Sequence, residues 1–209
     1  MTTTDTGVPA VLRGRDIVVV DVEGNGYHPQ EIVEIAIIPV DGATVTPETI
    51  NSCRVRPQHP IVPFATHQVH GIRNKDVIGC PTWITVAPTV GRALFDRILV
   101  AHNATVEYQT LARHLPDWKP PMVLDTLRLA RAVWPDRPSY ALGALLDYAS
   151  LNEPLPPEYR HHHAGCDAWS AWLLLRRLVE ESGLDWNGLV AAAALPEIVR
   201  PAMPEPRSW

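Results

Sequence analysis

The sequence predicts an α/β fold built on a mixed five-stranded sheet that is flanked by helices. Two observations support this prediction. The first third of the chain contains three short apolar segments separated by turns, which is typical of an antiparallel meander. The remainder alternates apolar segments with stretches of helical periodicity, which favours additional parallel strands.

Residues 16–23, 32–40 and 49–56 are the three strands predicted for the meander. The first is a continuous apolar run that ends in two acids and then Gly24-Asn25-Gly26, as expected of a buried central strand that leaves the sheet at a turn. A turn at Asp41-Gly42 separates the other two strands. Connections this short favour antiparallel pairing.

The second part of the chain is predicted to add two strands and most of the helices. We expect a helix at about 82–95, a strand at 97–101, a helix at 104–115 and a strand at 122–124. Four further helices are then predicted, at 126–133, 141–149, 164–181 and 184–194. This alternation predicts helices packed against both faces of one sheet.

The composition indicates one globular domain. The chain has 209 residues, of which 46% are hydrophobic and 20% charged, enough apolar material for a single core. We expect a flexible N-terminus at 1–14, a folded domain at 15–195 and a Pro-rich tail at 196–209. The formal charge of -5 argues against a broad basic face that grips long nucleic acid.

The cysteines and the first residues predict a cytoplasmic protein with no membrane partner. Three cysteines without a Cys-x-x-Cys spacing indicate neither a disulfide framework nor a zinc knuckle. Residues 1–9 are polar, lack a basic start and precede no long apolar run, so we expect no signal peptide or membrane span.

Asp21 and Glu23 form an acidic pair at the end of the first strand. Side chains alternate across a strand, so both carboxylates point to the same face. Two like charges in one small volume repel unless a cation compensates them, which favours a divalent metal. The alternative is that the acids mark the point where the strand reaches water, and the triplet taken alone favours that interpretation.

Two further acids stand at predicted helix starts. Glu107 lies in the first turn after His102-Asn103, where the helix dipole alone would also favour a carboxylate. Asp167 begins the last long helix, five residues after His162. That gap turns about 500° around an ideal helix, so His162 is expected on the preceding loop.

Taken together, the motifs Asp-x-Glu at 21–23, Ala-His-Asn-Ala-x-x-Glu at 101–107 and His-x-Ala-x-x-Asp at 162–167 resemble the DEDDh 3′-5′ exonucleases of the DnaQ-like, ribonuclease H-fold superfamily. The resemblance covers residues 16–178 and includes the segments 67–72, 125–127 and 139–142. One position departs from the family pattern, because Glu107 stands where the family usually carries Asp.

The resemblance implies a site with two Mg²⁺ or Mn²⁺ ions. Asp21 would bridge them, Glu23 and Asp167 would complete the first site, Glu107 would hold the second, and His162 would accept a proton from the attacking water. The terminal nucleotide would lie against residues of three segments: Gly24, Asn25, Gly26, His70, Ile72 and Asn103. Core packing is the alternative for Ile72, with Val69 as the other candidate to contact the base. If Glu107 only stabilises its helix, Asp125 and Glu34 are the poorer candidates for the fourth carboxylate.

The implied function is a metal-dependent 3′-5′ exonuclease that releases nucleoside 5′-monophosphates from the 3′ end of single-stranded DNA or RNA. A short-RNA-specific exoribonuclease and a catalytically weak, proofreading-type interaction module are the alternatives. The implied partners are a single-stranded 3′ end and either a polymerase or a second copy of the chain. The sequence leaves DNA and RNA open, since that choice depends on contacts to the 2′-hydroxyl.

Overall fold

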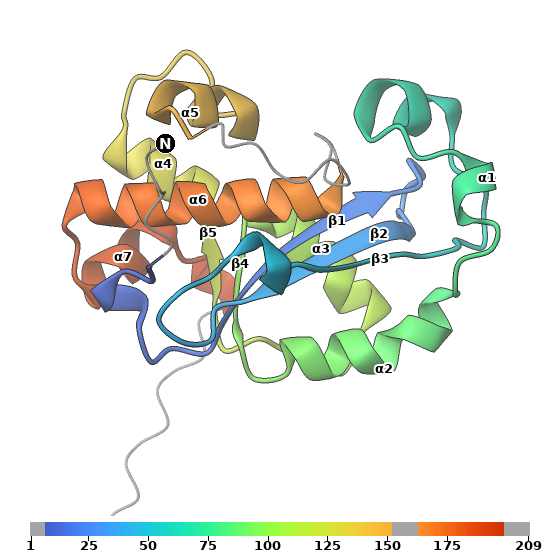
Figure 1. Ribbon diagram of the computed structural model, residues 1–209, viewed down its shortest axis with the longest axis horizontal. Helices are drawn as coiled ribbons and strands as arrows, with labels where there is room; N and C mark the ends of the chain where they lie inside the picture. The colour runs from blue at the N-terminus through green and yellow to red at the C-terminus, as the bar shows by residue number, and fades with distance from the viewer. Residues whose placement is uncertain (1–6, 152–162, 199–209) are drawn as a thin grey trace, which may run out of the picture.

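The computed structural model of the chain describes residues 7–151 and 163–198. Its centre is a five-stranded sheet in the order β3-β2-β1-β4-β5 (Figure 1). β1 pairs antiparallel with β2 and β2 with β3, while β4 runs parallel to β1 and β5 parallel to β4. The predicted mixed sheet is therefore confirmed, with strands at β1 Ile17–Gly24, β2 Ile32–Pro39, β3 Asn51–Arg54, β4 Ile98–Ala101 and β5 Val123–Asp125.

Helices cover both faces of the sheet. α6 lies along one face and crosses the central strands, as Figure 1 shows, while α2 and α3 pack on the opposite face. The helices are α1 Asn74–Val77, α2 Trp83–Leu94, α3 Ala104–His114, α4 Thr126–Val133, α5 Leu142–Ala149, α6 Ala164–Ser182 and α7 Trp186–Ala193.

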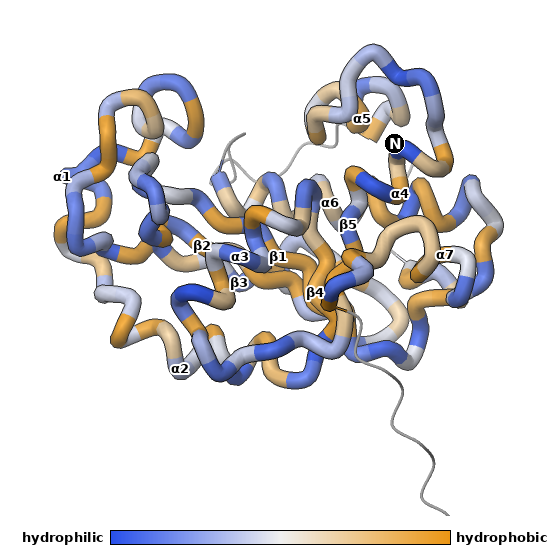
Figure 2. Tube along the Cα trace, turned by 180° about the vertical axis from the view of Figure 1, so that it is seen from behind, coloured by the Kyte–Doolittle hydropathy of each residue, from blue (hydrophilic) through white to orange (hydrophobic). Residues whose placement is uncertain are grey.

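The alternation of side chains along β1 divides the interior into two cores. Ile17 and Val19 pack with α6, whereas Val18, Val20 and Val22 pack with α2 and α3. Figure 2 shows β1 and β4 as mainly hydrophobic segments at the centre of the molecule. Because the strand alternates, the odd-numbered acids that follow Val19 share the face covered by α6.

Two short elements and the chain ends differ from the sequence-based expectation. A π-helical turn at Ala65–Val69 and the four-residue α1 were not predicted, because elements this short carry no readable periodicity. Within the segment 1–14, which the sequence predicts to be flexible, Val8 and Leu12 are buried in the core on the α6 side of the sheet. At the other end, Ile198 packs against the core of the opposite face.

Cys53 and Cys80 are half-buried and Cys166 is buried, and all three are free thiols. Within residues 7–151 and 163–198, every helix is too short or too polar to cross a lipid bilayer.

Candidate metal centre

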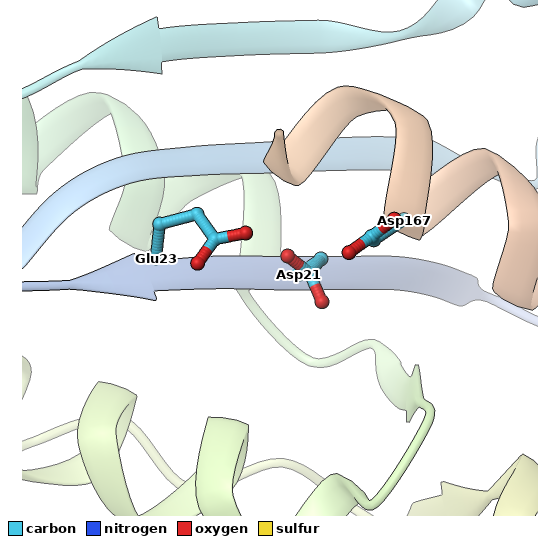
Figure 3. Close-up of side chains that lie close together, drawn as sticks. All are labelled: Asp21, Glu23 and Asp167. Carbon is cyan, nitrogen blue, oxygen red and sulfur yellow. The ribbon is translucent and has the colours of Figure 1, made fainter. Parts of the chain in front are cut away.

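Three carboxylates from two elements meet at one end of the sheet. Asp21 and Glu23 come from β1 and Asp167 comes from α6, and Figure 3 shows the three side chains directed toward one another. One oxygen of each lies within 4.8 Å of the others. Glu23 is buried, while Asp21 and Asp167 are half-buried. The predicted convergence of these acids is thus a feature of the folded chain.

The local structure explains why the acids meet. Asp21 and Glu23 follow Ile17 and Val19 on the β1 face that α6 covers. Asp167 lies in the first turn of α6, where its N–H donates to the His163 carbonyl at 3.1 Å. The start of α6 is therefore placed over the carboxyl end of β1, and the apolar residues on both sides keep it there.

The electrostatics of this cluster favour a bound cation. Burial, followed by repulsion from Glu23 and Asp167, raises the pKa of Asp21 well above its usual value. Burial and repulsion from Asp167 raise the pKa of Glu23 to about 9. A divalent cation would offset both effects and keep the carboxylates ionised at neutral pH.

Glu107 supplies a fourth carboxylate at the edge of this cluster. It lies one turn into α3 and is only 7% exposed. Burial is the main cause that raises its pKa to about 8, and its charge in turn raises the pKa of Asp21. Its Oε2 is buried without a hydrogen-bond partner. A buried carboxylate oxygen left unpaired beside three other acids fits a hard cation with oxygen ligands.

The turn between β4 and α3 is held by Asp125. Its Oδ1 accepts the Asn103 N–H at 2.9 Å and the Leu127 N–H at 2.8 Å. Asn103 adopts a left-handed conformation, with φ of 62°, and is exposed. Nε2 of His102 donates to the Tyr140 carbonyl at 3.0 Å, which fixes the ring behind this turn. The Asp125 carboxylate thus accepts backbone N–H groups, whereas the Glu107 carboxylate has an oxygen without a hydrogen-bond partner.

The turn after β1 is shaped by its two glycines and by Asn25. A Cβ at Gly24 would lie 2.4 Å from Gln30 Oε1, and one at Gly26, where φ is +84°, would lie 2.3 Å from Val62 Cγ2. Asn25 is fully buried, and its Oδ1 accepts the Glu31 N–H at 3.0 Å. The third position therefore requires glycine, a side chain at the first position would displace Gln30, and the Asn25 side chain closes the turn from within.

His70 and Ile72 are buried beside this turn. His70 Nε2 donates to the Gly24 carbonyl at 3.0 Å, and its Nδ1 accepts the Ile72 N–H at 3.0 Å. Ile72 is 1% exposed in a small core, the arrangement that the sequence left open as its alternative. Val69 is 41% exposed and Phe64 is 69% exposed. The apolar side chains available to a ligand on this segment are thus Val69 and Phe64, and the sequence did not single out Phe64.

The expected proton acceptor, His162, lies outside the described residues. The described chain resumes at His163, which precedes the first residue of α6 and is half-buried. The assignment of His162 rests on the motif.

An α/β sandwich with a carboxylate cluster across the end of its first strand is the architecture of the ribonuclease H-like fold. Residues 18–170 match the family model of the RNase T-type exonucleases. The chain belongs to this exonuclease family, in agreement with its resemblance to the DEDDh exonucleases of the DnaQ-like superfamily.

Relatives and solved structures agree with this assignment. A DNA polymerase III subunit epsilon-like protein from Rhodobacter capsulatus is 32% identical over 183 residues, which cover 83% of this chain and 25% of that protein. A PolC-type DNA polymerase III from Thermotoga maritima is 30% identical over 170 residues, which cover 78% of this chain and 12% of the relative. The chain thus matches a quarter or less of the length of these relatives.

Among solved structures, exonuclease X in complex with 5′ overhanging duplex DNA superimposes with a TM-score of 0.66 and 30% identity, over 84% of this chain and 98% of the other. The nuclease domain of 3′hExo, a DEDDh family member bound to rAMP, gives a TM-score of 0.61 at 16% identity, over 80% of this chain and 94% of that domain. The second likeness concerns the fold alone.

Proposed function

We propose that this chain hydrolyses the terminal phosphodiester bond at the 3′ end of a DNA strand, in the 3′-5′ direction, and releases a nucleoside 5′-monophosphate. The observation that carries the proposal is the convergence of Asp21, Glu23 and Asp167 within 4.8 Å, beside the unpaired buried oxygen of Glu107. Such a cluster is unfavourable without counter-charge, and cations held by it can promote the displacement at a phosphodiester.

The four carboxylates would hold two divalent cations, Mg²⁺ or Mn²⁺. Asp21 would bridge them, with Glu23 and Asp167 at the first and Glu107 at the second. Bound there, the cations would make water a better nucleophile and neutralise charge on the phosphate and the departing 3′ oxygen. The carboxylates, for their part, would keep the cations on the face of the sheet that α6 covers.

The remaining groups would position the nucleotide and move a proton. In the hydrolysis, water would add to phosphorus as the bond from phosphorus to the 3′ oxygen breaks, an imidazole nitrogen of His162 would take one proton from the water, and solvent would protonate the departing 3′ oxygen. The turn Gly24-Asn25-Gly26 allows close approach of the strand end, and His70 would act by fixing the Gly24 carbonyl. Val69, Phe64 and the exposed Asn103 would contact the terminal nucleotide.

The names of the relatives and of a similar solved structure support DNA as the substrate. The structure at 30% identity is an exonuclease bound to duplex DNA with a 5′ overhang. The curated relatives above carry DNA polymerase names. These polymerase names also support a polymerase as partner, and the three free thiols support a reducing, cytoplasmic setting.

The test is incubation of the purified chain with 5′-labelled single-stranded DNA and RNA of the same sequence, with Mg²⁺, Mn²⁺ or EDTA. We expect a ladder that shortens one nucleotide at a time from the 3′ end, loss of activity in EDTA and faster digestion of DNA. Equal turnover in EDTA would contradict the metal-dependent mechanism, and faster digestion of RNA would contradict the choice of substrate.

An interaction module with little catalysis is the second candidate. Glu107, which replaces the usual Asp of its motif, is the observation that favours it. A chain of this kind would bind a polymerase yet leave the labelled strand intact in both metals, so the same assay separates the two candidates.

A further inference from the structure

A fifth acid, Glu34, lies under the start of α6 and is not used by the proposed chemistry. It occupies the middle of β2, in an otherwise apolar strand, and it is 7% exposed. In the β1–β2 ladder Glu34 stands directly opposite Glu23, so both side chains leave the sheet on the α6 side. A buried carboxylate next to another acid is unfavourable unless specific partners compensate it.

The partners of Glu34 come from two elements. Its Oε2 accepts the backbone N–H of Ala164, the first residue of α6, at 2.9 Å. Nδ1 of His163 lies 3.2 Å from the same oxygen. On the other side, Arg54 of β3 donates from Nε to Oε1 at 3.4 Å. Two of these three contacts are made to the residues that begin α6.

These contacts connect Glu34 to the metal centre through the backbone. The His163 carbonyl accepts the N–H groups of Cys166 at 2.9 Å and Asp167 at 3.1 Å, so it forms the first hydrogen-bonded turn of α6. Glu34 holds this turn from below by the Ala164 N–H and the His163 ring. An anion at a helix start is also favoured by the exposed N–H groups and the helix dipole. Glu34 thereby adds polar contacts to the turn that carries Asp167, beside the apolar packing of α6 on β1.

We propose that Glu34 is a positioning residue that anchors the first turn of α6 to the sheet and so fixes Asp167 within the metal centre. The proposal deepens the function inferred above and rests on it for its effect on turnover. Glu34 acts on the metal centre indirectly, because it positions the first turn of α6, and it does not itself bind a cation. Its partners set it apart from Glu107, whose Oε2 is unpaired.

The experiment compares Glu34→Gln and Glu34→Ala with Glu48→Gln, a matched change of an exposed acid in the turn Pro47–Thr49. Gln retains an oxygen that can accept the Ala164 N–H, whereas Ala removes it. Three quantities are measured on the full chain: the affinity for Mn²⁺ by calorimetry, hydrogen exchange of the amides of residues 164–167, and kcat and KM on single-stranded DNA.

In Glu34→Ala we expect these amides to exchange faster and both Mn²⁺ affinity and kcat to fall about 10- to 100-fold, the range usual for residues that orient metal ligands. KM should stay within about twofold of the unaltered chain, because no nucleotide contact is lost. Glu34→Gln should recover most of the affinity and the amide protection, and Glu48→Gln should match the unaltered chain.

Two results would overturn the proposal. Unchanged exchange and Mn²⁺ affinity in Glu34→Ala would show that Glu34 does not hold the helix start. An equal loss of affinity in Glu34→Gln and Glu34→Ala, with unchanged amide exchange, would make Glu34 a direct ligand. If Glu34→Ala fails to fold, Glu34→Met, which fills the space but offers no acceptor to the Ala164 N–H, is measured in its place. If the unaltered chain binds Mn²⁺ but leaves DNA intact, the proposed function fails while exchange and affinity still test the anchor.

Discussion

The contact between β1 and α6 is apolar at one end and acidic at the other. At one end, Ile17 and Val19 of β1 share a fully apolar core with Trp172 and Leu175 of α6. At the other end the same strand and the same helix bring together Asp21, Glu23 and Asp167. A single pair of elements therefore contains both a stabilising interface and a cluster of mutually repelling acids.

This difference shows how the fold supports its candidate site. Apolar burial contributes roughly 25 cal/mol per Å², and this contribution fixes the angle between strand and helix. The acids at the far end then cannot move apart without disturbing that packing. The carboxylates therefore stay close together in the metal-free protein despite their repulsion. Such preorganisation is a general property of functional sites.

The largest expected effect comes from the acid end. Asp21→Asn should lower kcat/KM on the order of 10³-fold, about 4 kcal/mol of barrier, because the bridging charge between two cations is lost. The same variant should melt at a higher temperature in EDTA, since one repelling charge is gone. Steady-state kinetics and thermal melts measure the two. Asp117→Asn, a change of an exposed acid, is the control and should alter neither.

The second effect concerns the proton acceptor. His162→Ala should lower kcat about 10²- to 10⁴-fold, the usual loss for a general base, while calorimetric Mn²⁺ affinity stays unchanged. His161→Ala, a neighbour in the same triple histidine, should keep normal turnover. Collapse of metal affinity in His162→Ala would show that the motif is assigned in the wrong register.

The apolar end should respond in the opposite way. Leu175→Ala should lower the free energy of unfolding by about 2–5 kcal/mol, because it removes a fully buried side chain from the α6-side core. Below its lowered melting temperature, the folded variant should retain kcat, since no acid has moved. A large loss of kcat without a change in melting temperature would show that the two ends are not separable.

The sequence predicted more of this arrangement than a single motif would suggest. Strand alternation placed Asp21 and Glu23 on one face, and the order of the motifs predicted that Asp167 would join them. The sequence could not predict that His70 bonds the Gly24 carbonyl or that Ile72 is buried, because those contacts depend on two short turns at 65–69 and 74–77. Glu34 was visible as a charge inside an apolar strand, yet its partners at the start of α6 become apparent only in three dimensions.

The stability of the metal-free protein should also depend on pH. Burial and neighbouring acids raise the pKa of Glu23 to about 9 and of Glu107 to about 8. The folded state therefore binds protons more tightly than the unfolded chain, so stability is greatest below the unfolded pKa of 4.5 and falls as pH rises through the folded values. In EDTA, raising the pH from about 5.5 to about 8.5 should lower the free energy of unfolding by roughly 4 kcal/mol from Glu23 alone, because each pH unit over which only the folded state holds the proton costs about 1.4 kcal/mol. Tm should fall by on the order of 10 °C.

Added Mn²⁺ should reduce this dependence, because cations keep the acids ionised in the folded state. Glu23→Gln should also flatten the profile in EDTA. If the metal-free protein became more stable as pH rises over this interval, the clustered acids would not have the raised pKa values described above.

The smallest effect is expected from Glu107→Asp, a change at the position where the chain departs from its family. A glutamate is one methylene longer than an aspartate, so its carboxylate can reach the second cation, but an additional torsion must be ordered. Mg²⁺ demands near-octahedral geometry and suffers more from loose placement than Mn²⁺, so the unaltered chain should work faster in Mn²⁺. Glu107→Asp should remain active and change the ratio of the two rates only about threefold, toward equality. Glu107→Ala should lose activity in both metals. Normal turnover of the alanine variant would mean that this buried acid only stabilises α3, and the second cation would then lack the ligand that the unpaired Oε2 provides.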